Sequence, residues 1–425
     1  MRNKCIIFVH STFSVEYAYA AAKNNGYKVF SIVTTLEAIQ IKPKILSELS
    51  DYIFYGSSDP ASDLAAIKEM LADNQLDVAA IVNGIDFTLY YTDFLQKHIL
   101  NYPIDLVYSK IRLNKYKVNH LLKQNNIKII PSVEIQSKDD LVNHKDEILA
   151  LGWPMIAKPA EDTAGMSGVI VVNNMDELKT YLDDYLGSEN AYYKDKIISK
   201  IILQEYISTN VYQEFIVDFV SYEGKHYCNA IVPYGKSTLQ DNYQVFREYE
   251  PRVLSDIPGF EPIIEYIKSV LSALKVVSGF THNEVFWDGK DSFYLVESNH
   301  RVAGNNLSEV YQKVYGFSAF TQLFNLLKDD KIVAIPTIRT GYGMTLNLYN
   351  YSTPKATVIN LDEVKSVQNI IHFWHKDKLP EGFYRNYMRA NHISASVLMT
   401  NDDEKQLQKD VEILLEREKA GTLFK

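Results

Sequence analysis

Residues 1 to about 105 alternate short apolar runs with segments whose apolar residues recur at helical spacing. The apolar runs have the length of buried strands and occupy residues 5–9, 27–33, 52–55 and 78–82. Helices are predicted between them, for example over 15–24 and 61–73. This alternation predicts a Rossmann-like N-terminal domain with a parallel sheet covered by helices. The first strand runs into His10-Ser11-Thr12-Phe13-Ser14 without a glycine, so we expect no nicotinamide or flavin on this sheet.

The pattern changes after a helix predicted from about residue 115 to 124, because Asn125-Asn126 and Pro131 interrupt the chain. A compact unit follows, with strands at 154–158, 169–172 and 200–204 and a helix at 175–186. Strands then dominate, at 212–222, at 227–233 and in a hairpin that ends near 301, with a helix at 259–274. The last region alternates short strands and ends in a charged helix at 404–418. We predict an α/β protein, α+β in part, whose domains span 1–110, 111–210, 211–332 and 333–425.

The hairpin is predicted from a strand at 281–287, the turn signal Asp288-Gly289-Lys290-Asp291 and a second strand that leads to Asn299. A loop of two or of four residues places Glu284 on the same sheet face as Glu297 and Asn299, whereas a three-residue loop does not. We expect one of the two even-numbered loops.

Glu297, Asn299 and Arg301 are spaced two residues apart, so their side chains share one face of a strand. Carboxylate and amide oxygens suit a hard cation such as Mg²⁺. A planar guanidinium suits a phosphate or a carboxylate. Together they indicate a site for a metal-bound nucleotide whose phosphoryl group is transferred. The alternative is the solvated polar face of an edge hairpin.

A lysine and a loop of small residues form a second candidate site. Lys158 ends one predicted strand, and the small residues before the next strand include Ala164, Gly165, Ser167 and Gly168. Backbone N–H groups of such a loop can bind phosphate oxygens, and the lysine adds a positive charge. The Walker pattern is absent, because no Gly-Lys-Ser/Thr precedes a helix here. An ordinary hairpin turn is the alternative.

A third candidate site lies at the end of an apolar strand, in Gln204-Glu205-Tyr206-Ile207. Its backbone groups could pair with an adenine edge, which leaves Glu205 for the exocyclic amine or a ribose hydroxyl. Glu214 offers a carboxylate with the same ambiguity. The alternative for both is an ordinary strand end.

Two further residues are candidates for substrate contacts. His282 lies two residues before Glu284 and shares its face in a hairpin, although a hydrogen-bonded core histidine is the alternative. Glu248 lies in a loop-like region and could bind an amine, whereas a solvated acidic loop is its alternative.

Composition narrows the class of protein. The chain has 425 residues, of which 46% are hydrophobic and 23% charged, as in soluble globular proteins. A net charge of −9 without a long basic run disfavours a nucleic-acid partner. Cys5 and Cys228 are the only cysteines, which excludes a disulfide scaffold. No apolar run approaches the roughly 18 residues of a membrane span, and the run at 5–9 is too short for a signal peptide. We expect a cytoplasmic protein.

The order of these motifs resembles the ATP-grasp superfamily across nearly the whole chain. The resemblance rests on Lys115 in a helix, Lys158-Pro159 with its loop, Gln204 to Ile207, His282-Asn283-Glu284 and the Glu-x-Asn-x-Arg of 297–301. The last two motifs are most similar to those of the L-amino-acid ligases. The layout is also similar to biotin carboxylase and to the purine-pathway ligases.

The resemblance implies an ATP-grasp fold with an N-terminal Rossmann-like domain, a small lid subdomain, an antiparallel catalytic subdomain and a C-terminal subdomain. It also implies roles for individual residues. The phosphates would be bound by Lys115, Lys158 and the loop Ala164 to Gly168, and adenine would be held by Gln204, Glu205, Tyr206 and Ile207. Mg²⁺, with Mn²⁺ as an alternative, would be bound by Glu284, Glu297 and Asn299. Arg301 would stabilise the acyl phosphate and, with Glu248 and His282, contact substrate.

The chain departs from the family pattern at two places. The segment after Ile207 lacks the usual glycine turn, which leaves Glu214 open as the ribose ligand. His300 replaces the proline that often follows the metal asparagine, which bears on substrate contacts.

The activity implied by the resemblance is ATP-dependent joining of a carboxylate and an amine. An acyl phosphate would form, two L-amino acids would become a dipeptide, and ADP and phosphate would be released. The alternatives are another carboxylate ligase, of the purine-pathway or biotin-carboxylase kind, and a non-catalytic ATP-binding regulatory protein. The expected partners are small molecules, with a homodimer as a family-level expectation.

Overall fold

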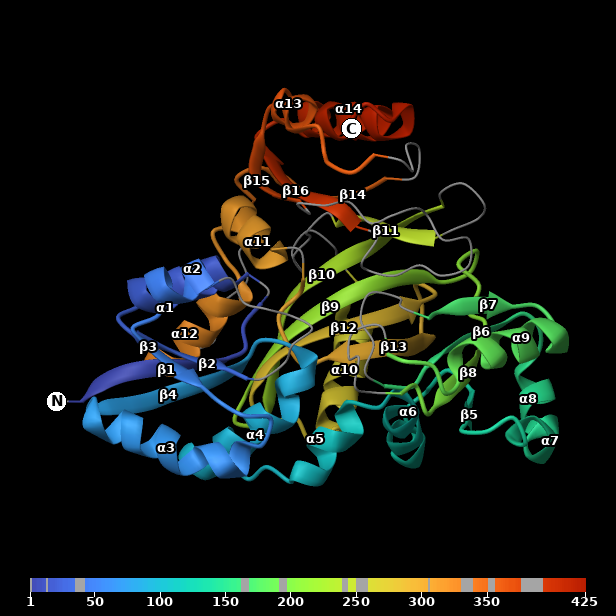
Figure 1. Ribbon diagram of the computed structural model, residues 1–425, viewed down its shortest axis with the longest axis horizontal. Coiled ribbons are helices and arrows are strands. Elements are labelled where there is room, and N and C mark those ends of the chain that lie inside the picture. Colours follow the sequence, from blue (N-terminus) through green and yellow to red (C-terminus); the bar gives the residue numbers. More distant parts are fainter. Residues whose placement is uncertain are drawn as a thin grey trace.

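The computed structural model arranges the chain around three β-sheets (Figure 1). The structure describes residues 2–12, 14–34, 43–161, 168–190, 197–238, 244–249, 259–304, 306–329, 339–350, 356–375 and 393–425. Of the helices in these ranges, none is both long and apolar enough to cross a bilayer.

The N-terminal sheet has four parallel strands in the order β3-β2-β1-β4, as the alternating pattern predicts. Its elements are β1 (Asn3–Val9), α1 (Val15–Asn24), β2 (Lys28–Val33), α2 (Pro43–Leu49), β3 (Tyr52–Tyr55), α3 (Pro60–Asp73) and β4 (Leu76–Asn83). The last five residues of β1 are buried, because helices cover both faces of this sheet. The carboxyl ends of β1 and β4 meet at one edge.

A helical connection leads from this sheet to the second one. It consists of the short turn η1 (Asp86–Thr88), α4 (Leu89–Ile99), α5 (Leu106–Arg112) and α6 (Lys115–Gln124). The helix α6 has the bounds that the sequence predicts. Asn114 caps it, because its side chain accepts a hydrogen bond from the N–H of Lys117 at 2.9 Å.

The second sheet is antiparallel, with the strand order β5-β8-β6-β7. Its elements are β5 (Ser132–Ile135), α7 (Asp140–Asn143), α8 (Lys145–Leu151), β6 (Met155–Pro159), β7 (Ile170–Val172), α9 (Met175–Tyr185) and β8 (Ile201–Glu205). One face packs on α8 and α9 through a cluster that includes Ile148, Leu178 and Leu182. The small subdomain therefore has its own core.

The third sheet has eight strands in the order β13-β12-β9-β10-β11-β14-β16-β15. Its elements are β9 (Gln213–Tyr222), β10 (Lys225–Thr238), β11 (Gln244–Tyr249), α10 (Glu261–Ala273), β12 (Gly279–Trp287), β13 (Phe293–Asn299), α11 (Leu307–Tyr315), α12 (Ala319–Asp329), β14 (Tyr342–Tyr349), α13 (Leu361–Lys365), β15 (Ile370–His375), β16 (Ile393–Asn401) and α14 (Glu404–Ala420). The strands of the last region thus continue the sheet that carries the hairpin. The domain boundaries remain predictions.

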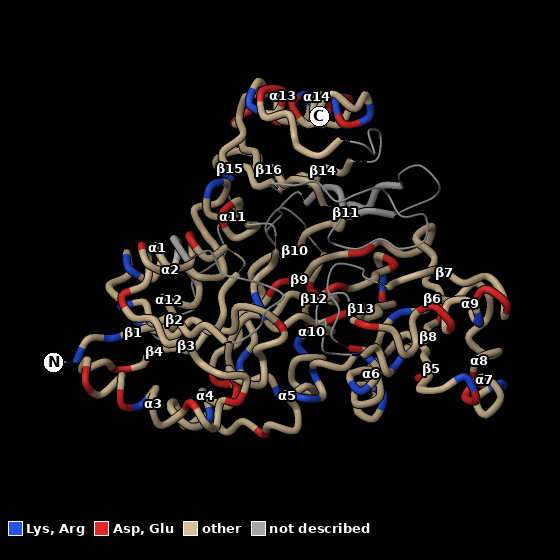
Figure 2. Tube along the Cα trace, in the orientation of Figure 1, with Lys and Arg blue, Asp and Glu red and all other residues tan. Residues whose placement is uncertain are grey.

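Helices divide the two faces of this sheet between them. One face of β9 and β12 packs on α10 through residues such as Phe215, Val217 and Val285. The other face carries Ile216 and Val220, which pack toward α11 and α12. This second face also carries the polar residues of the hairpin, and Figure 2 shows acidic positions on β12 and β13 beside basic positions on α6 and β6.

Candidate active site

The hairpin β12–β13 pairs Glu284 directly with Glu297 and His282 with Asn299. These four side chains lie on one face, as the sequence predicts. The predicted loop of two or four residues is wrong, because Trp287 pairs with Phe293 and five residues, 288–292, join the strands. A β-bulge between the Glu284 and Val285 pairs adds one residue on β13 and restores the register.

His282 is held against Asp218 of the neighbouring strand β9. Its Nδ1 lies 2.8 Å from Asp218 Oδ1, and its Nε2 lies 4.0 Å from Glu284 Oε1. The ring is 6% exposed. A carboxylate on each side fixes the ring orientation, so both alternatives for His282, an oriented active-site group and a hydrogen-bonded core histidine, fit this geometry.

The oxygen donors around Asn299 fit a hard cation. The amide nitrogen can donate to Glu297 Oε1 at 2.8 Å and to Asp86 Oδ2 at 3.2 Å, and in the exchanged orientation its oxygen faces those two carboxylates. Oxygens that face one another in this way suit a bound cation. Within the described ranges no cluster of three or more Asp, Glu, His or Cys side chains forms a metal site by itself. The structure thus brings the Asn299 amide together with Glu297 and Asp86, and Glu284 pairs with Glu297 across the hairpin, whereas the binding of Mg²⁺ by Glu284, Glu297 and Asn299 remains a prediction.

Lys115 and Lys158 approach this face from two other elements. Lys115 begins α6, its N–H donates to Ala160 O at 2.9 Å, and its Nζ lies 3.8 Å from Glu297 Oε1. Lys158 lies in β6 and is 6% exposed. Burial and the Lys115 charge lower the pKa of Lys158 to about 8, whereas the charges of Glu297, Glu284 and Glu214 act in the opposite direction. The structure thus gathers both predicted lysines around the predicted carboxylates.

The predicted adenine segment borders Lys158. Strand β8 pairs with β6, with Ile202 opposite Lys158 and Gln204 opposite Ile156. Gln204 and Ile207 are buried, Glu205 is half-buried and Tyr206 is 37% exposed. Glu214 is the second residue of β9 and is buried. Contact of these residues with adenine or ribose remains a prediction.

Part of the predicted phosphate loop lies outside the described residues, namely Ala164, Gly165 and Ser167. Gly168 is described and has φ +75°, and an added Cβ there would lie 2.9 Å from Pro159 Cδ. Its carbonyl accepts a hydrogen bond from Tyr181 Oη at 2.7 Å. A glycine is therefore required where the loop meets β7.

The backbone of Glu248 lies in β11 opposite Gly235 and Leu346. Its predicted loop position is therefore wrong, because the residue belongs to a strand. Its side chain lies outside the part that the structure describes.

Arg301 follows β13 and contacts a residue that sequence reasoning missed. Its Nε donates to Asp86 Oδ2 at 2.9 Å, and its Nη1 donates to Val302 O at 2.9 Å. Asp86 comes three residues after the carboxyl end of β4. Polar residues at the carboxyl end of a parallel strand are the signal that could have found it.

Asn83 and Gly84, at the carboxyl end of β4, make close contacts with two other segments. An added Cβ at Gly84 would lie 2.2 Å from Ser11 Cα, so only glycine lets the ends of β1 and β4 approach. Asn83 Nδ2 donates to His300 O at 2.8 Å, which joins this edge to the end of the hairpin.

An open pocket with a volume of about 50 Å³ lies beside these groups, and its lining includes Asp86, Lys115, Glu297, Asn299 and His300. Burial and the Arg112 guanidinium lower the pKa of His300 well below its usual range, so the ring is neutral. The pocket is bordered by both the N-terminal domain and the hairpin, which makes it the best candidate for substrate binding.

The comparisons with known proteins bear on the fold. No family model matches the chain. A curated L-arginine-specific L-amino acid ligase of Bacillus subtilis is 23% identical over 214 residues, which are 50% of this chain and 49% of that relative. The match thus spans about half the length of the curated relative.

Solved structures match over almost the whole chain. An L-amino acid ligase from Bacillus licheniformis has a TM-score of 0.73 at 15% identity and covers 98% of both chains. N5-carboxyaminoimidazole synthetase from Staphylococcus aureus complexed with ADP has a TM-score of 0.67 at 13% identity over 96% of both chains. Phosphoribosylglycinamide synthetase from Anaerococcus prevotii has a TM-score of 0.63 at 15% identity, covering 97% of this chain and 98% of that one. The chain therefore has the ATP-grasp fold, with its parallel N-terminal sheet and two antiparallel sheets.

Proposed function

We propose that this protein is an ATP-dependent carboxylate–amine ligase that joins two L-amino acids through an acyl phosphate. The observation that carries the proposal is the convergence of two lysines, two paired glutamates, an asparagine and an arginine on one face of the catalytic sheet. Positive and negative groups in this arrangement suit a nucleotide triphosphate with its cation. ADP and phosphate would be the other products.

The proposed reaction requires the protein to position the reacting groups and to neutralise their negative charge. A free carboxylate is a poor acyl donor, because oxide would have to leave, whereas phosphate leaves readily from an acyl phosphate. Lys115 and Lys158 would bind the phosphates, and Arg301 would stabilise the negative charge on the acyl oxygen when the amine attacks. Glu284, Glu297 and Asn299 would hold Mg²⁺, with Mn²⁺ as an alternative, and the cation would supply further charge neutralisation.

The other predicted contacts complete the proposal. Gln204 to Ile207 would hold adenine, Glu214 the ribose, and the loop Ala164 to Gly168 would cover the phosphates and exclude water. Glu248 and His282 would contact the carboxylate substrate. The cytoplasmic location and the homodimer stay predictions.

The dipeptide product is supported by the names of two matched proteins, which are an L-arginine-specific L-amino acid ligase and an L-amino acid ligase. A second candidate is a carboxylate ligase of purine synthesis, because N5-carboxyaminoimidazole and phosphoribosylglycinamide synthetases share the fold. The third alternative is a non-catalytic ATP-binding protein, and the presence of Arg301 with all three oxygen ligands argues against it.

The test is phosphate release from Mg²⁺-ATP in the presence of pools of the common L-amino acids, followed by mass spectrometry for dipeptides. Stimulated release with a new dipeptide mass supports the proposal and names the substrates. ATP binding without stimulation by any pool contradicts it and favours one of the two alternatives.

Arg301→Ala should lose turnover by about a hundredfold or more while binding of Mg²⁺-ATP stays within about twofold, because the guanidinium acts on the acyl group and not on the nucleotide. Isothermal titration and phosphate release measure the two effects. Arg417→Ala is the matched control, since Arg417 also pairs with a carboxylate, Glu363 at 3.2 Å, but lies in α14. Normal turnover in Arg301→Ala would exclude the proposed role.

A further inference from the structure

Asp86 accepts hydrogen bonds from two consecutive residues that directly follow β13, and its Oδ2 also lies 3.2 Å from the side-chain amide of Asn299, the last residue of that strand. Its Oδ1 accepts from the backbone N–H of His300 at 2.8 Å, and its Oδ2 accepts from Arg301 Nε at 2.9 Å. The carboxylate is 24% exposed and the guanidinium 15% exposed. Partial burial strengthens this charge-assisted contact relative to an ion pair on the open surface.

The same segment of the N-terminal domain also holds the backbone carbonyl of His300. Asn83 Nδ2 donates to His300 O at 2.8 Å. The Asn83 Oδ1 in turn accepts from Thr88 Oγ1 at 2.8 Å and from Thr92 Oγ1 at 2.9 Å, so the amide orientation is fixed. The backbone of His300, the residue before Arg301, is therefore held at its N–H by Asp86, which follows β4, and at its carbonyl by Asn83, the last residue of β4.

Asp86 gives Arg301 a carboxylate partner that the proposed function does not assign to the cation. Glu297 precedes it by four residues on the same strand end, and Glu284 pairs with Glu297 across the hairpin. Asp86 supplies a carboxylate on the N-terminal side, and its bond to Nε fixes the plane of the guanidinium.

We infer that Asp86 is a positioning residue for the ligase reaction, through which the N-terminal domain sets the orientation of Arg301. The inference rests on the proposed function, because it assumes that Arg301 acts on the acyl group. It assigns the N-terminal domain a part in the chemistry besides that of forming a pocket wall.

The test is a double-mutant cycle with Asp86→Asn and Arg301→Ala in the full chain. Asparagine retains an oxygen that can accept from the His300 N–H but loses the charge that holds the guanidinium. We expect turnover in Asp86→Asn to fall by about tenfold to a hundredfold, with KM for ATP within about twofold of the wild type. Phosphate release from Mg²⁺-ATP with the pool of common L-amino acids measures both parameters.

The double variant decides how Asp86 acts. If it acts through Arg301, Asp86→Asn should cause no further loss in the Arg301→Ala background. Equal losses in both backgrounds would show an independent structural role and overturn the inference, as would wild-type turnover in Asp86→Asn.

Asp51→Asn is the matched control. Asp51 also accepts from a backbone N–H, Val29 at 2.9 Å, and pairs with a cation, Lys28 at 3.2 Å, but it lies beside β2. We expect its turnover to equal that of the wild type, and a loss equal to that of Asp86→Asn would overturn the inference. Wild-type protein that releases no phosphate, or Arg301→Ala with full turnover, would contradict the proposed function itself, so the two failures are distinguishable.

Discussion

Lys158 shows how burial tunes a single binding group. The side chain is 6% exposed, and burial lowers its pKa from 10.5 to about 8. The folded protein thus penalises the charged ammonium, and the penalty is relieved as the pH rises through the folded pKa. Phosphate oxygens favour the charged form, so under the proposed function nucleotide binding would be coupled to protonation of Lys158.

The affinity for Mg²⁺-ADP should therefore fall as the pH rises from about 7 to about 9.5, because the free protein loses the ammonium near pH 8. In Lys158→Arg the guanidinium stays charged over this range, so the decline should disappear. Isothermal titration at several pH values measures both. An equal decline in the two proteins would show that another group titrates.

Strand periodicity alone places Glu297 and Asn299 on one face, whereas Glu284 joins them through the register of the hairpin. The contacts of Asp86 and Asp218 were not predictable from the sequence, because their partners lie far away in sequence. Asp86 meets Arg301 across 215 residues, and Asp218 meets His282 across 64. Such pairs depend on how sheets and domains pack, and no local pattern encodes that packing.

At the scale of elements, the hairpin shows that a correct face can follow from a wrong loop. The sequence predicted an even loop and a regular ladder, whereas the structure has a five-residue loop and a bulge. Asp288 Oδ1 accepts from the N–H of Lys290 at 2.9 Å and of Ser292 at 3.0 Å, which stabilises the longer loop. The two deviations cancel, and Glu297 still faces Glu284.

The start of α6 positions Lys115, and its cap can be tested. Besides capping the helix, Asn114 donates to Glu161 Oε2 at 3.1 Å, which ties α6 to the end of β6. Asn114→Ala should lower the free energy of unfolding by about 1 kcal/mol. It should also weaken binding of Mg²⁺-ADP, because the backbone that carries Lys115 is no longer held in place by the cap.

Asn174→Ala is the control for this change. Asn174 caps α9 by accepting from the N–H groups of Asp176 and Glu177 at 3.1 and 3.0 Å. Asn174→Ala should lower the denaturation midpoint by about as much as Asn114→Ala does, while the affinity for Mg²⁺-ADP stays unchanged. Equal weakening of binding in both variants would show that the effect is general destabilisation.

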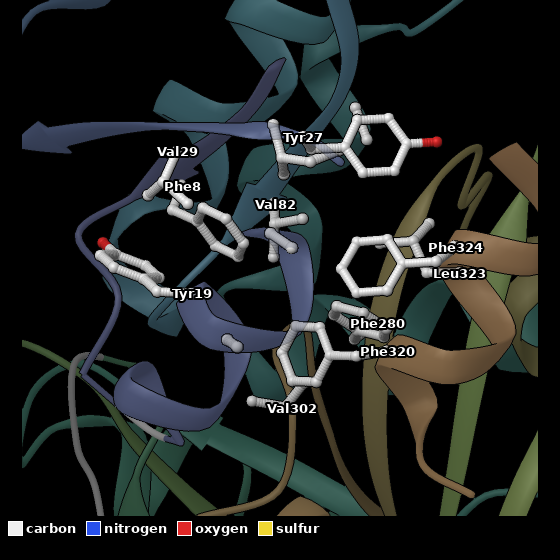
Figure 3. Close-up of a cluster of buried hydrophobic side chains, with 14 of the residues drawn as sticks. Phe8, Tyr19, Tyr27, Val29, Val82, Phe280, Val302, Phe320, Leu323 and Phe324 are labelled. Carbon is white, nitrogen blue, oxygen red and sulfur yellow. The ribbon is translucent and has the colours of Figure 1, made fainter. Parts of the chain in front are cut away.

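At the scale of the molecule, one apolar cluster joins the N-terminal domain to the eight-stranded sheet (Figure 3). Phe8, Tyr19 and Tyr27 from the N-terminal domain meet residues such as Phe280 and Phe320 in it. Phe320 packs at a ring distance of 4.9 Å from Phe280 and 5.9 Å from Tyr17. Val302, which follows Arg301, belongs to the same cluster. The apolar cluster and the Asp86–Arg301 pair therefore both hold the N-terminal domain against the eight-stranded sheet and the segment that follows β13.

Phe320→Ala should test this coupling, because it opens a cavity between the two bodies instead of within one of them. We expect a loss of about 3–5 kcal/mol in the free energy of unfolding. Turnover should also fall at temperatures where the variant is still folded, since a shift of the N-terminal domain moves Asp86 away from Arg301.

Leu414→Ala is the comparison, because Leu414 is fully buried in the separate cluster of α14 and β14–β16. The Leu414→Ala variant should lose about 2–5 kcal/mol in the free energy of unfolding, yet keep its turnover at temperatures below the unfolding transition. Denaturation curves and phosphate release measure the two quantities. If both variants lose turnover only in proportion to stability, the junction holds the molecule together without orienting Arg301, and the N-terminal domain would have no part in positioning the reacting groups.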